Sequence, residues 1–371
     1  MAFTSSEDND LALATPPDKI QHPISGDKEI KEYSLPSYFT SLSVADLKVD
    51  SDLSETDNSN SDSAIETSDD FVTVSARSRQ FDGLEGNART YHRFKEGKYH
   101  LPNDEIEKSR LDLQHHLCCL AFESHYLAPI ENLNGGLHNV LDFATGTGIW
   151  AIEFAAQFPD VVVVGTDLSP IQPEHVPVNC HFEVEDAEDT WNFAQKFDYI
   201  HGRMLVTCFQ SHLKVFGSAF DALRSGGYIE LQDASFPFLG ADDRWNGSAF
   251  QHWMKLLMDG SKALGKDWNR VPRYKGYLEE LGFVDIVERR FNCPLGTWAK
   301  GKKNKVLGTW GRENILSGLG ALSMMVLTRG LGMTVAEIEL LLVDVRNDIN
   351  KDGEQSIHLY APMFVVYGRK P

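Results

Sequence analysis

Short apolar runs alternate with amphipathic stretches over residues 137–291. The runs rich in β-branched and aromatic side chains predict six strands, at 140–143, 161–166, 182–184, 197–202, 228–232 and 283–291. Between them, apolar side chains recur three and four positions apart, as at Ile149, Ile152 and Ala156, which predicts helices. Strands that alternate with helices indicate an α/β fold with a mostly parallel sheet.

About 70 residues separate the sixth predicted strand from a last one at 363–369. A loop of that length without secondary structure is uncommon in a compact domain. An apolar helical pattern through Leu316 and Leu319, and a capping box formed by Thr334 and Glu337, predict two helices here. We interpret them as a cap over the carboxyl ends of the strands, where ligands bind in open α/β sheets.

A loop of small residues, Ala144-Thr145-Gly146-Thr147-Gly148, joins the first strand to its helix. Glycine lets the backbone approach a ligand closely, and a helix N-terminus offers it unpaired N–H groups. Asp167 ends the second strand, 21 residues after Gly146, where a carboxylate can accept hydrogen bonds from both hydroxyls of a ribose. The pattern therefore predicts a nucleotide-binding βαβ unit.

Two classes of ligand use such a unit. Gly146, Gly148 and Ala151 fit a dinucleotide fingerprint. However, Asp142 at the end of the first strand would face a cation, and S-adenosylmethionine (SAM) has one at its methionine end, whereas NAD has none to justify an acid at this position. Asp186 follows the third strand, where a carboxylate can read the adenine amino group. We therefore predict SAM as the cofactor. Its predicted binding residues are Asp142, Ala144, Gly146, Gly148, Asp167, Asp186 and Ala187.

Five linked motifs resemble those of the fungal LaeA-like methyltransferases: DFATGTG at 142–148, GTDLSPIQP at 165–173, FEVEDAEDTW at 182–191, FDYIHGRM at 197–204 and GGYIELQD at 226–233. Residues 91–117 and the closing FVVYGRKP are also similar to that family, so the resemblance runs from about residue 89 to the end. It implies a Rossmann-like class I methyltransferase fold, with a mostly parallel seven-stranded sheet, an antiparallel last strand and a helical cap insertion. The family usually has glycine where this chain has Ala144, and we expect a negative φ there.

The chain divides into five predicted parts. Residues 1–70 carry 16 acidic and four basic side chains and few aromatic ones, which predicts a disordered acidic tail. This tail is either a solvated extension or a docking or phosphorylation segment. The other parts are an N-terminal segment and helix at 71–136, a SAM-binding core at 137–291, the cap at 292–361 and the final core strand at 362–371.

A helix is predicted to start after Asp104, which with Glu107 forms an acidic variant of a capping box. Its expected buried stripe consists of Ile106, Leu113, Leu117 and Leu120. We expect ordinary packing, not metal ligation, for His115 and His116. The aromatic and basic segment 89–100 before this helix is either a surface connection or a cover over the cofactor.

The fourth strand ends in His201-Gly202-Arg203-Met204. Methyltransferases that modify amino groups of nucleic acids or glutamine carry an Asn/Asp-Pro-Pro-aromatic motif there, so its absence argues against those substrates. His201 is the predicted catalytic residue, as a general base, because imidazole titrates near neutral pH. It could equally be a structural histidine, and Asp233 is a second candidate. We expect an enclosed acceptor pocket lined by the cap, His201, Arg203 and residues 91–99.

Charge and composition exclude other classes of protein. A net charge of −19 and a pI near 5.1 argue against direct binding of nucleic acid. No apolar run approaches the ~20 residues of a membrane span, and the first residues do not resemble a targeting signal. Five cysteines without a CxxC pair predict reduced thiols in the cytoplasm or nucleus. The lysine cluster at 300–305 is either a solvated loop or a nuclear import signal.

Three functions remain open at this point. The first is an enzyme that methylates a small molecule of fungal secondary metabolism. The second, implied by the resemblance, is a LaeA-like nuclear regulator of secondary-metabolite genes that acts through velvet-type protein partners. The third is a scaffold that has lost catalysis, which we rank last because the acids and glycines of the cofactor motifs are all present.

Overall fold

The computed structural model describes residues 47–50, 84–86 and 89–371. Most of the predicted acidic tail lies outside the described residues. Residues 47–50, which fall within the predicted tail, contact the insertion. Leu47 is buried, Val49 forms an antiparallel bridge with Ala299, and the backbone N–H of Asp50 donates to the carbonyl of Trp298 at 2.9 Å.

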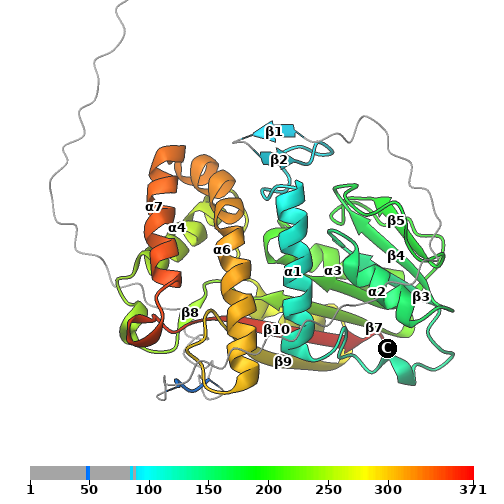
Figure 1. The fold of residues 1–371 in the computed structure, drawn as a ribbon. Coiled ribbons are helices and arrows are strands. Elements are labelled where there is room, and N and C mark those ends of the chain that lie inside the picture. Colours follow the sequence, from blue (N-terminus) through cyan, green and yellow to red (C-terminus); the bar gives the residue numbers. More distant parts are fainter. Residues whose placement is uncertain (1–46, 51–83, 87–88) are drawn as a thin grey trace, which may run out of the picture. The chain divides into compact units, whose positions relative to one another are not determined.

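The main sheet has eight strands in the described part of the chain, in the order β5-β4-β3-β6-β7-β10-β8, with β9 also paired to β10 (Figure 1). The strands are β3 (Asn139–Phe143), β4 (Val162–Asp167), β5 (Cys180–Val184), β6 (Phe197–Arg203), β7 (Leu223–Ala234), β8 (Leu239–Gly240), β9 (Val284–Pro294) and β10 (Leu359–Arg369). Strands β3 to β7 are parallel, whereas β10 runs antiparallel to β7, β8 and β9. The predicted class I fold is thus confirmed, with β8 as one strand more than expected. A separate hairpin pairs β1 (Leu84–Gly86) with β2 (Arg89–Tyr91).

Seven α-helices accompany the sheet in the described residues. They are α1 (Glu105–Phe122), α2 (Ile149–Gln157), α3 (His212–Ala222), α4 (Ala249–Ala263), α5 (Tyr274–Glu280), α6 (Lys302–Leu331) and α7 (Val335–Ile349). Trp150 and Phe154 of α2 stack on each other and are buried against strands β3, β4 and β6. This packing fixes the start of α2 at the end of β3, where the glycine loop lies.

The predicted stripe of α1 is right at Leu117, which is buried, but wrong at Ile106 and Leu120, which are 64% and 40% exposed. Glu107 and Arg110 are buried instead. The guanidinium of Arg110 donates to Glu107 at 2.6 Å and to the side-chain oxygen of Asn314 in α6 at 3.1 Å. A hydrophobic pattern could not reveal this face in full, because an ion pair forms part of it.

The 70-residue insertion contains the two long helices α6 and α7. Helix α6 packs beside α1, α4 and α7 (Figure 1), and α7 begins with the capping box of Thr334 and Glu337. By length and composition α6 could cross a membrane, contrary to the expectation that no apolar run is long enough. However, half of its most apolar window is buried inside the protein. Its contacts are therefore those of an internal helix.

Candidate active site

The glycine loop turns through three left-handed residues. Ala144, Gly146 and Gly148 have φ angles of 53°, 61° and 80°, so the negative φ expected for Ala144 is wrong. The backbone N–H of Thr145 donates to the carbonyl of Thr166 at 2.9 Å, which holds this turn against the end of β4. Alanine in this region costs about 1–2 kcal/mol relative to its usual conformations. Ala144 therefore adopts a conformation that glycine would adopt without this cost.

Gly148 has a second reason to be glycine. A Cβ atom placed there would lie 2.4 Å from the ring of Phe182, and Gly148 lines neither of the cavities described below. Its place in the structure is that of a helix N-cap packed under an aromatic ring. Gly146 does face the cavities, and a Cβ there would meet only ordinary contacts.

The carboxyl ends of β3 and β4 carry the first two predicted acids. Asp142 is buried and accepts hydrogen bonds from Nδ1 of His201 at 2.7 Å and from the hydroxyl of Thr145. Asp167 accepts from the backbone N–H groups of Gly146 and Ser169, both at 2.9 Å. Burial raises the pKa of Asp167 to about 6, and the two N–H donors oppose that rise. A carboxylate has about four lone-pair sites, so Asp167 retains capacity for ribose hydroxyls.

The third acid, Asp186, is already paired. Its Oδ2 accepts from Nζ of Lys95 at 2.8 Å and from Nζ of Lys98, both in the segment between β2 and α1. The backbone carbonyl of Lys98 in turn accepts from Nζ of the buried Lys266 at 2.6 Å. Segment 89–100 therefore reaches the predicted adenine site, as expected if it covers the cofactor.

Two adjoining cavities lie at the strand ends. The larger, of about 170 Å³, is lined by Asp167, Asp186 and Ala187, by Lys98 and Tyr99, and by residues of α6. The smaller, of about 60 Å³, is lined by Asp142, Thr145 and His201 among others. The two share six lining residues: Leu111, Gln114, Ala144, Gly146, Arg203 and Met204. The predicted cofactor residues other than Gly148 thus surround one continuous space that extends under α6.

The order of the predicted residues along this space matches the order of the groups in SAM. The acids predicted for adenine and ribose lie on the larger cavity, and the acid predicted for the methionine end lies on the smaller one. The ring nitrogen Nε2 of His201 is buried in the smaller cavity's wall without a hydrogen-bond partner in the described structure. Such an orphaned polar atom is typical of a site that a ligand or water completes.

His201 is fully buried and stacks on Trp150, with ring centroids 3.7 Å apart. It faces the smaller cavity and does not line the larger one. Its proposed role as a general base therefore stays a prediction. Asp233, the second candidate, lines neither cavity; it accepts from the hydroxyl of Tyr274 at 2.9 Å, and burial raises its pKa to about 7.

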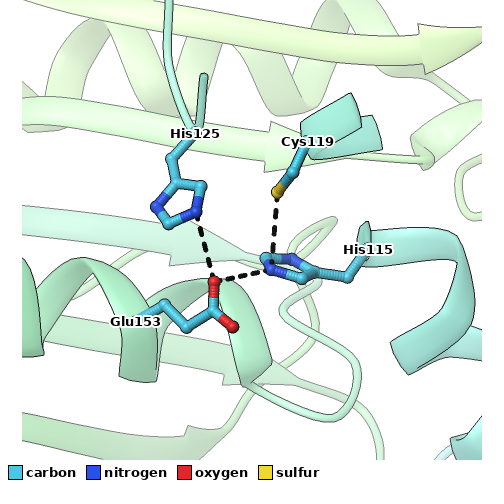
Figure 2. Close-up of side chains that lie close together, drawn as sticks. All are labelled: His115, Cys119, His125 and Glu153. Atoms are coloured by element: carbon cyan, nitrogen blue, oxygen red, sulfur yellow. Dashed lines mark hydrogen bonds and ion pairs between the residues drawn. The ribbon is translucent and has the colours of Figure 1, made fainter. Parts of the chain in front are cut away.

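Four residues that sequence reasoning did not connect lie together beside the smaller cavity (Figure 2): His115, Cys119, His125 and Glu153. Their potential ligand atoms lie within 4.8 Å of one another, and this set of donors suits zinc in type. The spacing of these residues along the chain does not reveal their proximity, which arises because α1, α2 and the loop at His125 converge here.

The hydrogen bonds of this cluster nevertheless oppose a cation. Arginine can only donate, and NH2 of Arg203 lies 2.7 Å from Nδ1 of His115. Neutral His115 must then carry its proton on Nε2, which donates to Glu153 at 2.8 Å. Burial and the charge of Arg203 both lower the pKa of His115, and burial raises the pKa of the Cys119 thiol. A protonated ring nitrogen, a protonated thiol and a guanidinium make a hydrogen-bonded network, not a metal centre.

Comparison with known proteins also indicates a methyltransferase. A family model described as a methyltransferase domain matches residues 113–284. Methyltransferase pytC of Aspergillus terreus is 30% identical over 83% of this chain and 94% of its own length. The chain belongs to the LaeA-like family of SAM-dependent methyltransferases.

Other members of this family carry different names. The secondary metabolism regulator laeA of Monascus pilosus is 33% identical, over 78% of this chain and 79% of that protein. The protein-methionine methyltransferase laeA of Emericella nidulans is 31% identical, over 77% and 76% respectively. Among solved structures, a Haemonchus contortus phosphoethanolamine N-methyltransferase in complex with SAM is 16% identical, with a TM-score of 0.40 over 71% of this chain and 52% of that one.

Proposed function

We propose that this LaeA-like protein transfers the methyl group of SAM to a mostly hydrophobic small molecule of fungal secondary metabolism. One observation carries the proposal: the larger cavity continues from the predicted adenosine site into an apolar chamber under α6. The chamber is lined by Leu117, Phe236, Phe238, Cys293, Leu295, Ile315, Leu322, Ala361 and Met363. Such concave, largely apolar sites with few polar groups suit small-molecule ligands.

The polar groups near the chamber are few. Arg110 lines it but is neutralised by Glu107, and Asn314 accepts a hydrogen bond from the same arginine. A histone tail would need a surface groove with many acidic groups, whereas the chamber walls come from buried positions of α1, α6, β9 and β10. These features favour a small acceptor over a basic peptide.

SAM supplies an activated methyl group on a sulfonium, so the protein's contribution is alignment and exclusion of water. In the described structure no histidine lines the larger cavity. Burial raises the pKa of both lining thiols, Cys208 and Cys293, to about 12, so neither is a thiolate near neutral pH. The chamber therefore favours an acceptor atom that needs no strong base, unless the acceptor reaches His201 in the adjoining cavity.

Methyl-labelled SAM would test the proposal. The purified full-length protein is incubated separately with a fungal metabolite extract and with histones, and the label is followed by mass spectrometry. We expect label on small molecules, and its loss in a variant with Asp167→Ala. Label on histones alone would overturn the small-molecule proposal.

A second candidate is a regulator that works through protein partners. Two relatives are named as laeA proteins, and one of those names specifies protein methionine as the acceptor. A thioether carries no proton, so its methylation requires no base, which is compatible with the lining of the larger cavity. Recovery of the protein from cytoplasmic and nuclear fractions, followed by a search for velvet-type partners or a bound metabolite, separates the two candidates.

A further inference from the structure

Arg203 carries a charge that the described part of the chain does not balance. It is half-buried at the end of β6, and no carboxylate of the described residues lies within ion-pair distance of it. Its NH2 donates to Nδ1 of His115, while NH1 is buried without a hydrogen-bond partner in the same residues. Burying an unpaired cation is expensive. The position therefore suggests that an anion binds to NH1.

The groups that hold Arg203 orient it without neutralising it. His115 offers a neutral nitrogen to NH2 and passes its own N–H to Glu153, whose Oε2 also lies 3.2 Å from Nε2 of His125 (Figure 2). The nearest part of this network is thus an uncharged ring, and the carboxylate lies on its far side. The cluster therefore has a role that needs no metal: it fixes NH2 of the guanidinium and leaves NH1 available for a ligand.

The smaller cavity has the charge pattern of an amino-acid zwitterion. Among its described lining residues, Asp142 is the one carboxylate and Arg203 the one guanidinium. The remaining walls are mostly glycine, alanine, threonine and apolar side chains. A methionine moiety brings one ammonium and one carboxylate, and Asp142 was predicted to face the cationic methionine end. A partner for the carboxylate is the missing element.

We propose that NH1 of Arg203 binds the α-carboxylate of the methionine moiety of SAM, with His115, Glu153 and His125 as positioning residues. The proposal rests on SAM being the cofactor. Arg203 also lines the larger cavity, so a carboxylate of the methyl acceptor is the competing occupant, which the experiment distinguishes.

Two ligands that differ only in the carboxylate provide the test. S-adenosylhomocysteine contains it, and S-adenosyl-3-thiopropylamine keeps the ammonium but lacks it. Calorimetry measures both against the wild type and Arg203→Met. We expect the variant to bind S-adenosylhomocysteine roughly tenfold to a hundredfold more weakly, the range for a hydrogen bond to a charged group. The decarboxylated ligand should bind both proteins equally, within about twofold.

Two further variants serve as controls for the loss of charge and for folding. Arg244→Met removes the same charge from an exposed arginine and should change neither affinity. Arg203→Lys keeps the charge but not NH1, and should give an intermediate loss for S-adenosylhomocysteine only; it also serves if the methionine variant does not fold. Equal losses of affinity for both ligands would overturn the proposal. No loss for either ligand would also overturn it, and would indicate that Arg203 binds the methyl acceptor instead. Failure of the wild type to bind S-adenosylhomocysteine would instead reject the cofactor itself.

Discussion

Asp167, the predicted ribose ligand, should make cofactor binding depend on pH. Its pKa in the ligand-free protein is raised to about 6 by burial, and ribose hydroxyls would donate to the ionised carboxylate. Bound ligand therefore favours the charged form, so affinity rises as pH increases through about 6. We expect affinity for S-adenosylhomocysteine to fall about tenfold from pH 7 to pH 5, measured by calorimetry. Asp167→Asn cannot ionise and should bind weakly with a flat profile. A wild-type profile that is equally flat would contradict this assignment.

The variant Ala144→Gly tests how the loop tolerates an alanine in the left-handed conformation. Ala144→Gly removes about 1–2 kcal/mol of backbone strain, partly offset by about 0.4–1 kcal/mol because glycine is more disordered in the unfolded chain. Urea denaturation should show unchanged stability or a gain of up to about 1.5 kcal/mol. Gly148→Ala is the contrast: with a φ of 80° and Phe182 in the way, it should lose at least about 2 kcal/mol. A destabilised Ala144→Gly variant would show that the alanine methyl packs productively.

The sequence could predict that the proposed cofactor residues lie together, but not all their partners. Asp142, Gly146, Asp167 and Asp186 belong to short motifs at the ends of predicted strands, and parallel strand ends meet at one edge of a sheet. Arg203 was predicted to line the pocket, but its support by His115 and Glu153 depends on the packing of α1 against α2. Local periodicity did not predict that packing, since the apolar pattern of α1 included the exposed Ile106 and Leu120 and missed the buried His115.

At the scale of elements, the segment between β2 and α1 lies beside the predicted adenine site. Lys98 bonds to Asp186, lines the larger cavity and is anchored through its carbonyl to Lys266. We expect Lys98→Met to weaken binding of S-adenosylhomocysteine severalfold, by about 0.5–1.5 kcal/mol, mainly through faster release. Stopped-flow measurement of the dissociation rate checks this.

Lys95→Met is the matched control for that variant. Lys95 bonds to the same carboxylate, but it does not line the cavity and also pairs with Asp189. Its loss should affect release less than loss of Lys98 does. Tighter binding in Lys98→Met would mean that the lysines compete with adenine for Asp186 and do not cover it.

The elements themselves were largely predictable, because strands β3 to β7 and helices α2 to α4 have clear periodicity. The short strand β8 was not, since two residues carry no pattern and their pairing depends on the course of β10. The length of the insertion predicted helices in the cap. The long apolar helix α6 shows that composition alone does not distinguish a buried helix from a membrane-spanning one, because both environments favour apolar side chains.

At the scale of the whole molecule, residues 47–50 join the N-terminal region to the cap. The backbone N–H of Lys300 donates to the carbonyl of Lys48 at 2.6 Å, and Nζ of Lys305 lies 2.7 Å from the carboxylate of Asp50. In the same cluster Lys303 pairs with Glu123 at the end of α1. Part of the lysine cluster at 300–305 is therefore engaged in ion pairs within the protein. Its use as a nuclear import signal stays a prediction.

Two truncations separate this contact from the rest of the N-terminal region. Deletion of residues 1–46 should leave the free energy of unfolding nearly unchanged, because their acidic, apolar-poor composition offers little to bury. Deletion of residues 1–50 also removes Leu47, which is 7% exposed, and should cost about 1.5–3 kcal/mol. Leu47→Ala in the full chain is the matched point variant and should reproduce most of that loss in urea denaturation. Equal stability of the two truncated proteins would show that the bridge between Val49 and Ala299 contributes nothing, and that the cap holds its place through α1, α4 and α7 alone.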